Sequence, residues 1–207
     1  MIEVIVMTVP RMPKDVWALS EKRKEKKPHV TNNTGKQEWY TPEHIIKAAT
    51  KVLGTIALDP ASSEMANRIV KAERIYTAED DGLSKEWHAE TLWLNPPYTR
   101  SLVGRFVDKL LESLESGKVG RAIVLVNNAT ETAFGQKLLS ARYFPAVCFP
   151  KGRIRFIDGS GEPTGAPLQG QMIVMLQSVS KTSAMDCTKG VGLFTKVFGS
   201  IGVCLCA

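Results

Sequence analysis

Apolar positions recur along the middle of the chain with two different periods, and their alternation predicts a mixed α/β fold. Three segments carry apolar residues three and four positions apart, which is typical of helices with one buried face: 41–53, 101–117 and 130–141. Four short apolar runs are typical of buried strands: 55–58, 91–94, 121–128 and 146–150. Elements that alternate in this order predict a parallel sheet with right-handed crossovers.

The last third of the chain departs from this alternation. Residues 153–157 and 171–176 are two apolar runs around a loop rich in glycine and proline, which predicts an antiparallel strand pair. Residues 178–207 have many small residues and weak periodicity. We expect this tail to pack on the body as a short strand or helix, or to be incidental, and we assign it no function.

The first 35 residues differ in composition from the rest. The segment Glu21–Lys27 holds five basic and two acidic residues, and a polar, turn-rich stretch follows it. This run fits either a solvated helix end with a linker or a basic arm that contacts phosphates. The predicted organisation is therefore a basic extension at 1–35, a main domain at 36–177 and a tail at 178–207.

Composition narrows the class of protein. The 207 residues are 43% hydrophobic with a formal net charge of +6, which fits a globular protein with a sizeable core. The positive charge is compatible with a polyanionic partner, and equally with a generic basic protein. No run of about 20 apolar residues is present, so we expect no membrane span. The four cysteines form no CxxC pair and the three histidines show no metal-ligand pattern, which favours a cytoplasmic protein with reduced thiols and no metal site.

The stretch TLWLNPPYTR, residues 91–100, carries the candidate chemistry. Its two prolines end a strand, because proline cannot donate a ladder hydrogen bond, and they also stiffen the turn. The side-chain carbonyl of Asn95 and the backbone carbonyl of Pro96 are two acceptors that can hold the hydrogens of an exocyclic amine and favour a pyramidal nitrogen. Tyr98 can stack on the ring that carries the amine. A second segment, DPAS at 59–62, also follows a predicted strand, and ligands of parallel sheets bind at such strand ends.

Five segments in order resemble the phage-type, Dam-like family of DNA N6-adenine methyltransferases of phages and prophages. They are EWYTP, LDPAS, YTAEDDGLSKEW, LWLNPPY and GRIRFIDG...GAPLQGQMIVML, between about Lys36 and Gln177. The resemblance implies a compacted, Rossmann-like class I methyltransferase sheet with an antiparallel C-terminal strand pair. It also implies an adenine-specific DNA methyltransferase in the cytoplasm of a bacterial host. Its cofactor would be S-adenosyl-L-methionine, and its substrate double-stranded DNA with the target adenine flipped out of the helix.

The resemblance also assigns residues. It implies that the catalytic motif is Asn95, Pro96, Pro97 and Tyr98. The cofactor contacts that it implies are Tyr40, Thr41, Pro42, Asp59, Pro60 and one of the pair Asp80 and Asp81. Thr41 and Pro42 also fit a helix start, with Thr41 as the N-cap residue.

Basic residues beside these motifs are candidate DNA contacts: Arg100, Lys151, Arg153 and Arg155. Alternation along the predicted strand 153–157 puts Arg153 and Arg155 on one side, where they face phosphates or form an ordinary polar sheet face.

The sequence departs from the family pattern in two ways. The run DPASSEMANRIV contains none of the glycines that often give the cofactor room after the first strand. Asp59 and Asn95 are only 36 positions apart, so a strand-helix unit between them is compressed or missing. A large target-recognition domain is not evident either, so we expect short or loose sequence specificity.

Two other functions stay open at this point. NPPY motifs also occur in methyltransferases that act on RNA bases or on protein glutamine. A chain without glycines after its first strand also fits a non-catalytic nucleic-acid-binding relative.

Overall fold

A seven-stranded mixed sheet is the frame of the protein, in a computed structural model that describes residues 39–143, 145–165 and 167–206. The predicted extension at 1–35 lies outside the described residues. The strands are β1 (Leu58–Asp59), β2 (Arg74–Ile75), β3 (Ala89–Leu94), β4 (Val119–Asn127), β5 (Ala146–Pro150), β6 (Gln171–Gln177) and β7 (Gly202–Cys206). The helices are α1 (Glu43–Leu53), α2 (Glu64–Val70), α3 (Arg100–Glu115), α4 (Ala133–Leu138) and α5 (Ala184–Phe198), with a 3-10 turn at Ala141–Tyr143.

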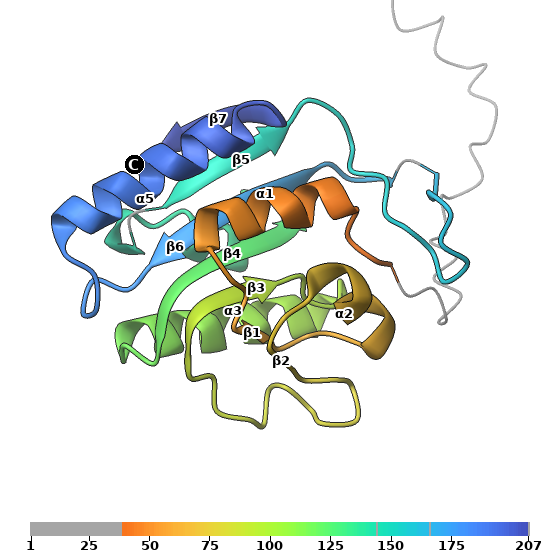
Figure 1. The fold of residues 1–207 in the computed structure, drawn as a ribbon, viewed down its shortest axis with the longest axis horizontal. Helices are drawn as coiled ribbons and strands as arrows, with labels where there is room; N and C mark the ends of the chain where they lie inside the picture. The colour runs from red at the N-terminus through yellow and green to blue at the C-terminus, as the bar shows by residue number, and fades with distance from the viewer. Residues whose placement is uncertain (1–38, 144, 166, 207) are drawn as a thin grey trace, which may run out of the picture. The chain divides into compact units, whose positions relative to one another are not determined.

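The sheet has the strand order β2-β1-β3-β4-β6-β5-β7 (Figure 1). The first four strands are parallel, as the alternation of helices and strands predicts. Strand β6 runs antiparallel to both of its neighbours, β4 and β5, and β7 closes the edge antiparallel to β5. The central position of β4 explains its continuous apolar run, because a strand covered on both faces buries every side chain.

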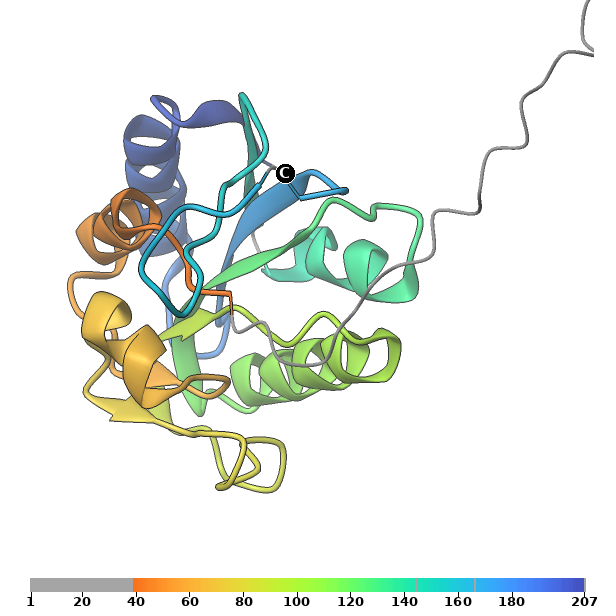
Figure 2. The same cartoon turned by 90° about the vertical axis from the view of Figure 1, so that its right-hand side faces the viewer.

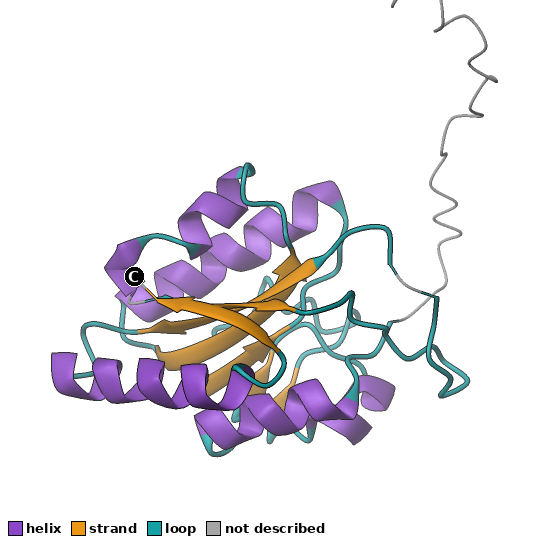
Figure 3. Cartoon of the chain, turned by 90° about the horizontal axis from the view of Figure 1, so that it is seen from above, coloured by secondary structure: helices purple, strands orange, loops and turns teal. Residues whose placement is uncertain are grey.

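Helices cover both faces of the sheet (Figures 2 and 3). One face packs against α3 and α4 through a core that includes Phe106, Leu110 and Leu138. The other face packs against α1, α2 and α5, with Ile45 and Phe194 in its core. Each fully buried side chain of this size contributes about 1.5–3 kcal/mol, so the two apolar helix faces account for the layering. None of the helices described here is long and apolar enough to span a membrane.

The predicted strand at 153–157 is wrong. Ile154 and Phe156 are buried while Arg153 and Arg155 are exposed, so the alternation is present, but the backbone does not join the sheet ladder. The Ile154 N–H donates to the Gln171 side chain at 3.1 Å, and Ile157 makes only isolated bridges. The expected pair of 153–157 with 171–176 is therefore replaced by pairing of β6 with β4 and β5.

The segment between Asp59 and Asn95 retains a strand-helix unit in compressed form. Helix α2 has seven residues and strand β2 has two. Ser63 accepts a hydrogen bond from the Ala66 N–H at 3.2 Å and so caps α2. The short unit explains why periodicity did not reveal it.

Residues of the predicted tail form α5 and β7. Cys187, Phe194 and Phe198 bury the inner face of α5, and β7 pairs with β5 over five residues. These elements belong to the same compact unit as the rest of the described chain.

Candidate active site

Strands β1 and β3 are neighbours, and the chain leaves them in opposite directions across the sheet. From β1 it passes through α2 to β2 on one side, and from β3 through α3 to β4 on the other. Ligands of open α/β sheets bind at the carboxyl ends of strands at such a switch point. Asp59 is the last residue of β1, and Asn95 follows β3 directly.

Register places the two polar residues toward the same face. Leu58 pairs with Leu92, so Asp59 lies level with Trp93. Because side chains alternate along strands, Asp59, Trp93 and Asn95 project toward the face covered by α1. A contact of Asn95 agrees with this placement, since its Nδ2 donates to Thr41 Oγ1, just before α1, at 3.3 Å.

The Asn95 side chain is held between two hydroxyl groups. Besides its bond to Thr41, its Oδ1 accepts a hydrogen bond from the Tyr98 hydroxyl at 3.0 Å. The Tyr98 hydroxyl also lies 3.3 Å from the Leu125 carbonyl, and the Tyr98 ring meets Phe156 edge-on with centroids 6.5 Å apart. Burial raises the pKa of Tyr98, so this hydroxyl stays protonated and remains a donor. The turn Asn95–Tyr98, called the NPPY corner below, is therefore fixed by two distant side chains, Thr41 and Phe156, and by the backbone carbonyl of Leu125.

Thr41 does not cap α1, contrary to the prediction. Pro42 occupies the N-cap position, and its carbonyl accepts from the Ile45 N–H at 3.0 Å. The Thr41 hydroxyl, in a side chain only 5% exposed, is used by Asn95 instead. Helix geometry alone thus leaves this hydroxyl available for the NPPY corner.

Asp59 is a buried carboxyl with few partners. It is 2% exposed, and its Oδ1 accepts from the Ala61 N–H at 3.3 Å. Burial raises the pKa of Asp59 to about 6, although the nearby Ser62 hydroxyl and the Ala61 N–H oppose this rise. The buried Ser62 hydroxyl nevertheless makes no hydrogen bond of ordinary geometry within the described part of the chain. This corner therefore holds a buried acid and a buried hydroxyl whose bonding capacity is largely unused.

A loop at 76–86 is fastened against the end of β1. The Tyr76 N–H donates to the Asp59 carbonyl at 3.0 Å, and the Ser62 N–H donates to the Tyr76 carbonyl at 2.9 Å. A Cβ atom at Gly82 would collide with the Pro60 carbonyl oxygen, so only glycine allows the two backbones to come this close. Gly82 therefore allows the 76–86 loop to pack directly on the backbone that follows β1.

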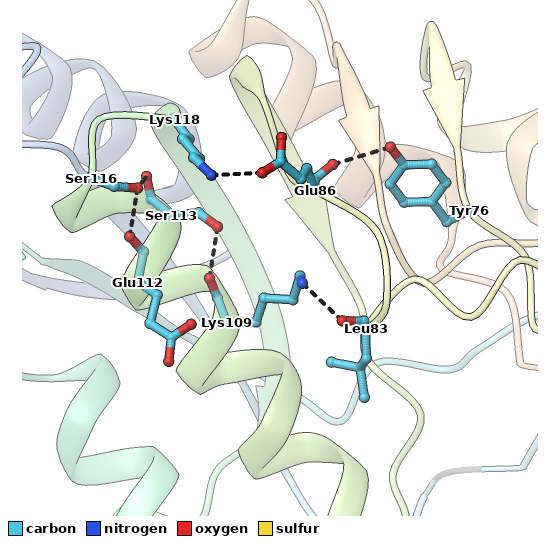
Figure 4. Close-up of polar contacts among 8 residues, drawn as sticks. All are labelled: Tyr76, Leu83, Glu86, Lys109, Glu112, Ser113, Ser116 and Lys118. Atoms are coloured by element: carbon cyan, nitrogen blue, oxygen red, sulfur yellow. Dashed lines mark hydrogen bonds and ion pairs between the residues drawn. The ribbon is translucent and has the colours of Figure 1, made fainter.

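Helix α3 and the turn that follows it hold the other side of this loop (Figure 4). Lys109 Nζ donates to the Leu83 carbonyl at 2.8 Å, and Lys118 pairs with Glu86 at 2.9 Å. The Tyr76 hydroxyl donates to the Glu86 carbonyl at 3.1 Å. These contacts fix the loop without using its two aspartates.

The two candidate aspartates of this loop are exposed and serve its turn. Asp80 accepts from the Thr77 N–H and from the Thr77 hydroxyl, both at 2.9 Å, and these bonds lower the pKa of Asp80. Asp81 has a left-handed backbone with φ of 51° and accepts from the Leu83 N–H at 3.3 Å. Both carboxylates keep free acceptor capacity toward solvent.

Three of the four candidate basic residues lie on the loop between β5 and β6, which reaches the turn that holds Asn95 and Tyr98. Tyr40 and Ile157 exchange two backbone hydrogen bonds of 2.8 Å, and Phe156 touches Tyr98. Lys151, Arg153 and Arg155 are exposed, and Arg153 donates to the Pro167 carbonyl at 2.8 Å. Arg100 begins α3 directly after the NPPY turn, and its side chain lies outside the described part.

The structure therefore brings the EWYTP, NPPY and GRIRF segments into contact, and places the DPAS segment with the 76–86 loop at the neighbouring strand end. The sequence did not single out three residues at these two strand ends: Ser62, Gly82 and Phe156. The Asp-Gly pair is a turn signal that could have drawn attention to Gly82. The other two carry no local signal, because their roles depend on neighbours far away in the chain.

These features define an α/β protein with a methyltransferase-like sheet and a polar corner at its switch point. A family model described as DNA N-6-adenine-methyltransferase (Dam) matches residues 29–190, and the chain belongs to this family. Membership of the Dam family, which the sequence predicted, is thereby confirmed, and it supports adenine in DNA as the substrate class. Members of this family generally use S-adenosylmethionine as their cofactor. Searches of curated proteins and of solved structures give no significant match.

Proposed function

We propose that this chain transfers a methyl group from S-adenosyl-L-methionine to the N6 amine of an adenine that is flipped out of double-stranded DNA. Its sheet would then be a compacted, Rossmann-like class I sheet. The observation that carries the proposal is the Asn95 amide, held by Thr41 and Tyr98 at the carboxyl end of β3. Family membership supports the substrate class.

In the proposed reaction, the turn at Asn95 and Pro96 holds the target amine by hydrogen bonds. The Asn95 Oδ1 has two lone pairs, of which the Tyr98 hydroxyl uses one, so one is left for a hydrogen of the amine. The Pro96 carbonyl accepts no hydrogen bond from the residues that the structure describes, and it would take the other hydrogen. Pro96 and Pro97 keep the turn stiff, so these acceptors are in place before the base arrives.

Two acceptors would favour a pyramidal nitrogen with a localised lone pair, placed for in-line attack on a methyl carbon. S-adenosylmethionine, when bound, would supply that methyl group on a sulfonium sulfur, which would leave as a neutral thioether when its bond to the methyl carbon breaks. No strongly basic residue is required, because the proton can pass to solvent after the nitrogen has become cationic. The Tyr98 ring, adjacent to the amide, would stack on the adenine.

The residues at the end of β1, Asp59 to Ser62, have side chains suited to bind the cofactor. A buried carboxylate without a charged partner is costly, and a cationic ligand would offset that cost. Asp59 provides such a carboxyl, and the buried Ser62 hydroxyl beside it makes no hydrogen bond of ordinary geometry among the described residues. S-adenosylmethionine carries both a positive charge and hydroxyl groups. We therefore propose Asp59 and Pro60 as cofactor contacts, with Tyr40 and Pro42 beside them and Asp80 or Asp81 binding the ribose or adenine.

The proposal predicts methylation of adenine in DNA and is tested with a methyl-labelled cofactor offered DNA, RNA and protein in parallel. We expect label in DNA alone, and sequencing of DNA from cells that express the chain should locate N6-methyladenine and its sequence context. Label in RNA or protein but not in DNA would instead identify an RNA-base or glutamine methyltransferase. Absence of cofactor binding in calorimetry would identify a non-catalytic relative.

A salt-dependence measurement tests the proposed DNA contacts of Arg153 and Arg155. Flipping a base costs a few kcal/mol, and phosphate contacts from Arg100, Lys151 and these two arginines would offset part of it. We expect R153A/R155A to weaken DNA binding and to reduce the slope of log K against log salt by about 0.9 for each lost contact. Lys181→Ala is the matched control, because Lys181 pairs with Glu90 near the opposite end of β3. An unchanged slope in the double variant would remove these arginines from the DNA interface.

A further inference from the structure

The buried hydroxyl of Thr41 has one described partner, the amide of Asn95. The distance from Asn95 Nδ2 to Thr41 Oγ1 is 3.3 Å, although the two residues are 54 positions apart. On the other side of the amide, the Tyr98 hydroxyl donates to Oδ1. An amide side chain between two hydroxyls cannot rotate about its terminal bond without breaking both hydrogen bonds.

The backbone around Thr41 is fixed from both directions. The preceding residue, Tyr40, exchanges two backbone hydrogen bonds with Ile157. The following residue, Pro42, is the N-cap residue of α1, and its carbonyl accepts a hydrogen bond from the Ile45 N–H. Phe156, the neighbour of Ile157, packs edge-on against Tyr98. The backbone of Thr41 is therefore held in place on both sides, and its hydroxyl accepts a hydrogen bond from the Asn95 amide.

We infer that Thr41 is a positioning residue for methyl transfer, which acts by holding the Asn95 amide with its carbonyl oxygen toward the target amine. This inference rests on the proposed function and gives Thr41 a role other than the cofactor contact implied by the family resemblance. It follows from the geometry of the side chains, because the Thr41 hydroxyl is buried against the amide at the end of β3.

The expected effect is on turnover rather than on binding. Without the Thr41 hydroxyl, only the hydrogen bond from Tyr98 opposes rotation of the amide. The rotated amide presents its NH2 group to the target amine, and the two sets of N–H hydrogens repel each other. Loss of one neutral hydrogen bond of this kind lowers the population of the productive orientation by about 10-fold. Because cofactor and DNA make their own contacts elsewhere, their affinities should change little.

The test compares Thr41→Val, which removes the hydroxyl at constant shape, with Thr41→Ser, which keeps it. We expect T41V to lower kcat about 10-fold, with the KM for DNA and the calorimetric Kd for S-adenosylmethionine within about twofold of the wild type. T41S should restore most of kcat. Thr50→Val, in the helix α1 that follows Thr41 and near its far end, is the matched control and should leave kcat unchanged.

Two results would overturn the inference: a wild-type kcat in T41V, or a weaker cofactor Kd with kcat intact, which would make Thr41 a cofactor contact. If T41V melts several degrees lower, Thr41→Ala carries the same comparison with a smaller side chain. Failure of the proposed function looks different. In that case the wild type itself methylates no DNA, or Asn95→Ala remains active, whatever the result at Thr41.

Discussion

Replacing Asn95 with alanine is expected to abolish methyl transfer while leaving cofactor binding largely intact. The substitution removes the side-chain acceptor at the carboxyl end of β3, which the hydroxyls of Thr41 and Tyr98 hold in place in the wild type. Loss of a fixed group that stabilises a transition state typically costs at least 10²-fold in kcat. Single-turnover methylation of DNA measures the effect, and calorimetry with S-adenosylmethionine measures the cofactor affinity.

Asn95→Asp is the informative companion to that variant. It keeps an acceptor oxygen of the same shape but loses the N–H that meets Thr41, so we expect partial activity well above that of Asn95→Ala. Circular dichroism should show the same fold in both, since Asn95 is only half-buried at the end of the strand. Near-normal turnover in the alanine variant would show that the active site lies elsewhere.

The parts of the fold that follow local periodicity were predictable from the sequence. Strands β3, β4 and β5 and helix α3 lie where their apolar patterns place them. Helix α2 and strand β2 are too short to carry a period, and the glycine-rich sequence of α5 hides an apolar face made by Cys187, Phe194 and Phe198. At 153–157 the sequence instead predicted a strand that is not there. The residues alternate as in a strand, but no neighbouring strand pairs with them beyond isolated bridges.

In the candidate site too, features that depend on neighbouring residues were predictable, and contacts between distant segments were not. The motif NPPY and its place at a strand end can be predicted from the sequence, since they depend on neighbouring residues. The partner of the Thr41 hydroxyl cannot, because a threonine before a proline is typical of a helix cap and Asn95 lies 54 positions away. The close approach of Gly82 to Pro60 likewise depends on two loops that meet only in the folded chain.

Asp59→Asn is expected to stabilise the cofactor-free protein near pH 7.5. The pKa of Asp59 is about 6 in the folded protein against 3.8 as its ordinary value, and burial is the main cause. Well below pH 3.8 the carboxyl is neutral in both states and its burial costs no stability. As the pH rises from about 3.8 to 6, the carboxyl ionises in the unfolded chain but stays protonated in the folded one, so the wild type loses up to about 3 kcal/mol of stability, and the loss is complete above pH 6. The asparagine keeps an acceptor for Ala61 and has no charge to bury, so urea unfolding should show this gain at pH 7.5 and almost none near pH 2.5.

The same substitution should weaken the cofactor. A cationic ligand gains from the ionised carboxylate, so we expect Asp59→Asn to raise the Kd for S-adenosylmethionine about 10-fold or more at pH 7.5. Wild-type affinity should fall as the pH drops below 6 and Asp59 takes up a proton, whereas the affinity of the variant should stay flat over that range. A variant that is both less stable and equally tight for cofactor would contradict both expectations. The expected opposite signs are typical of a functional residue, because a buried charge that costs stability in the free protein is retained only where a ligand repays it.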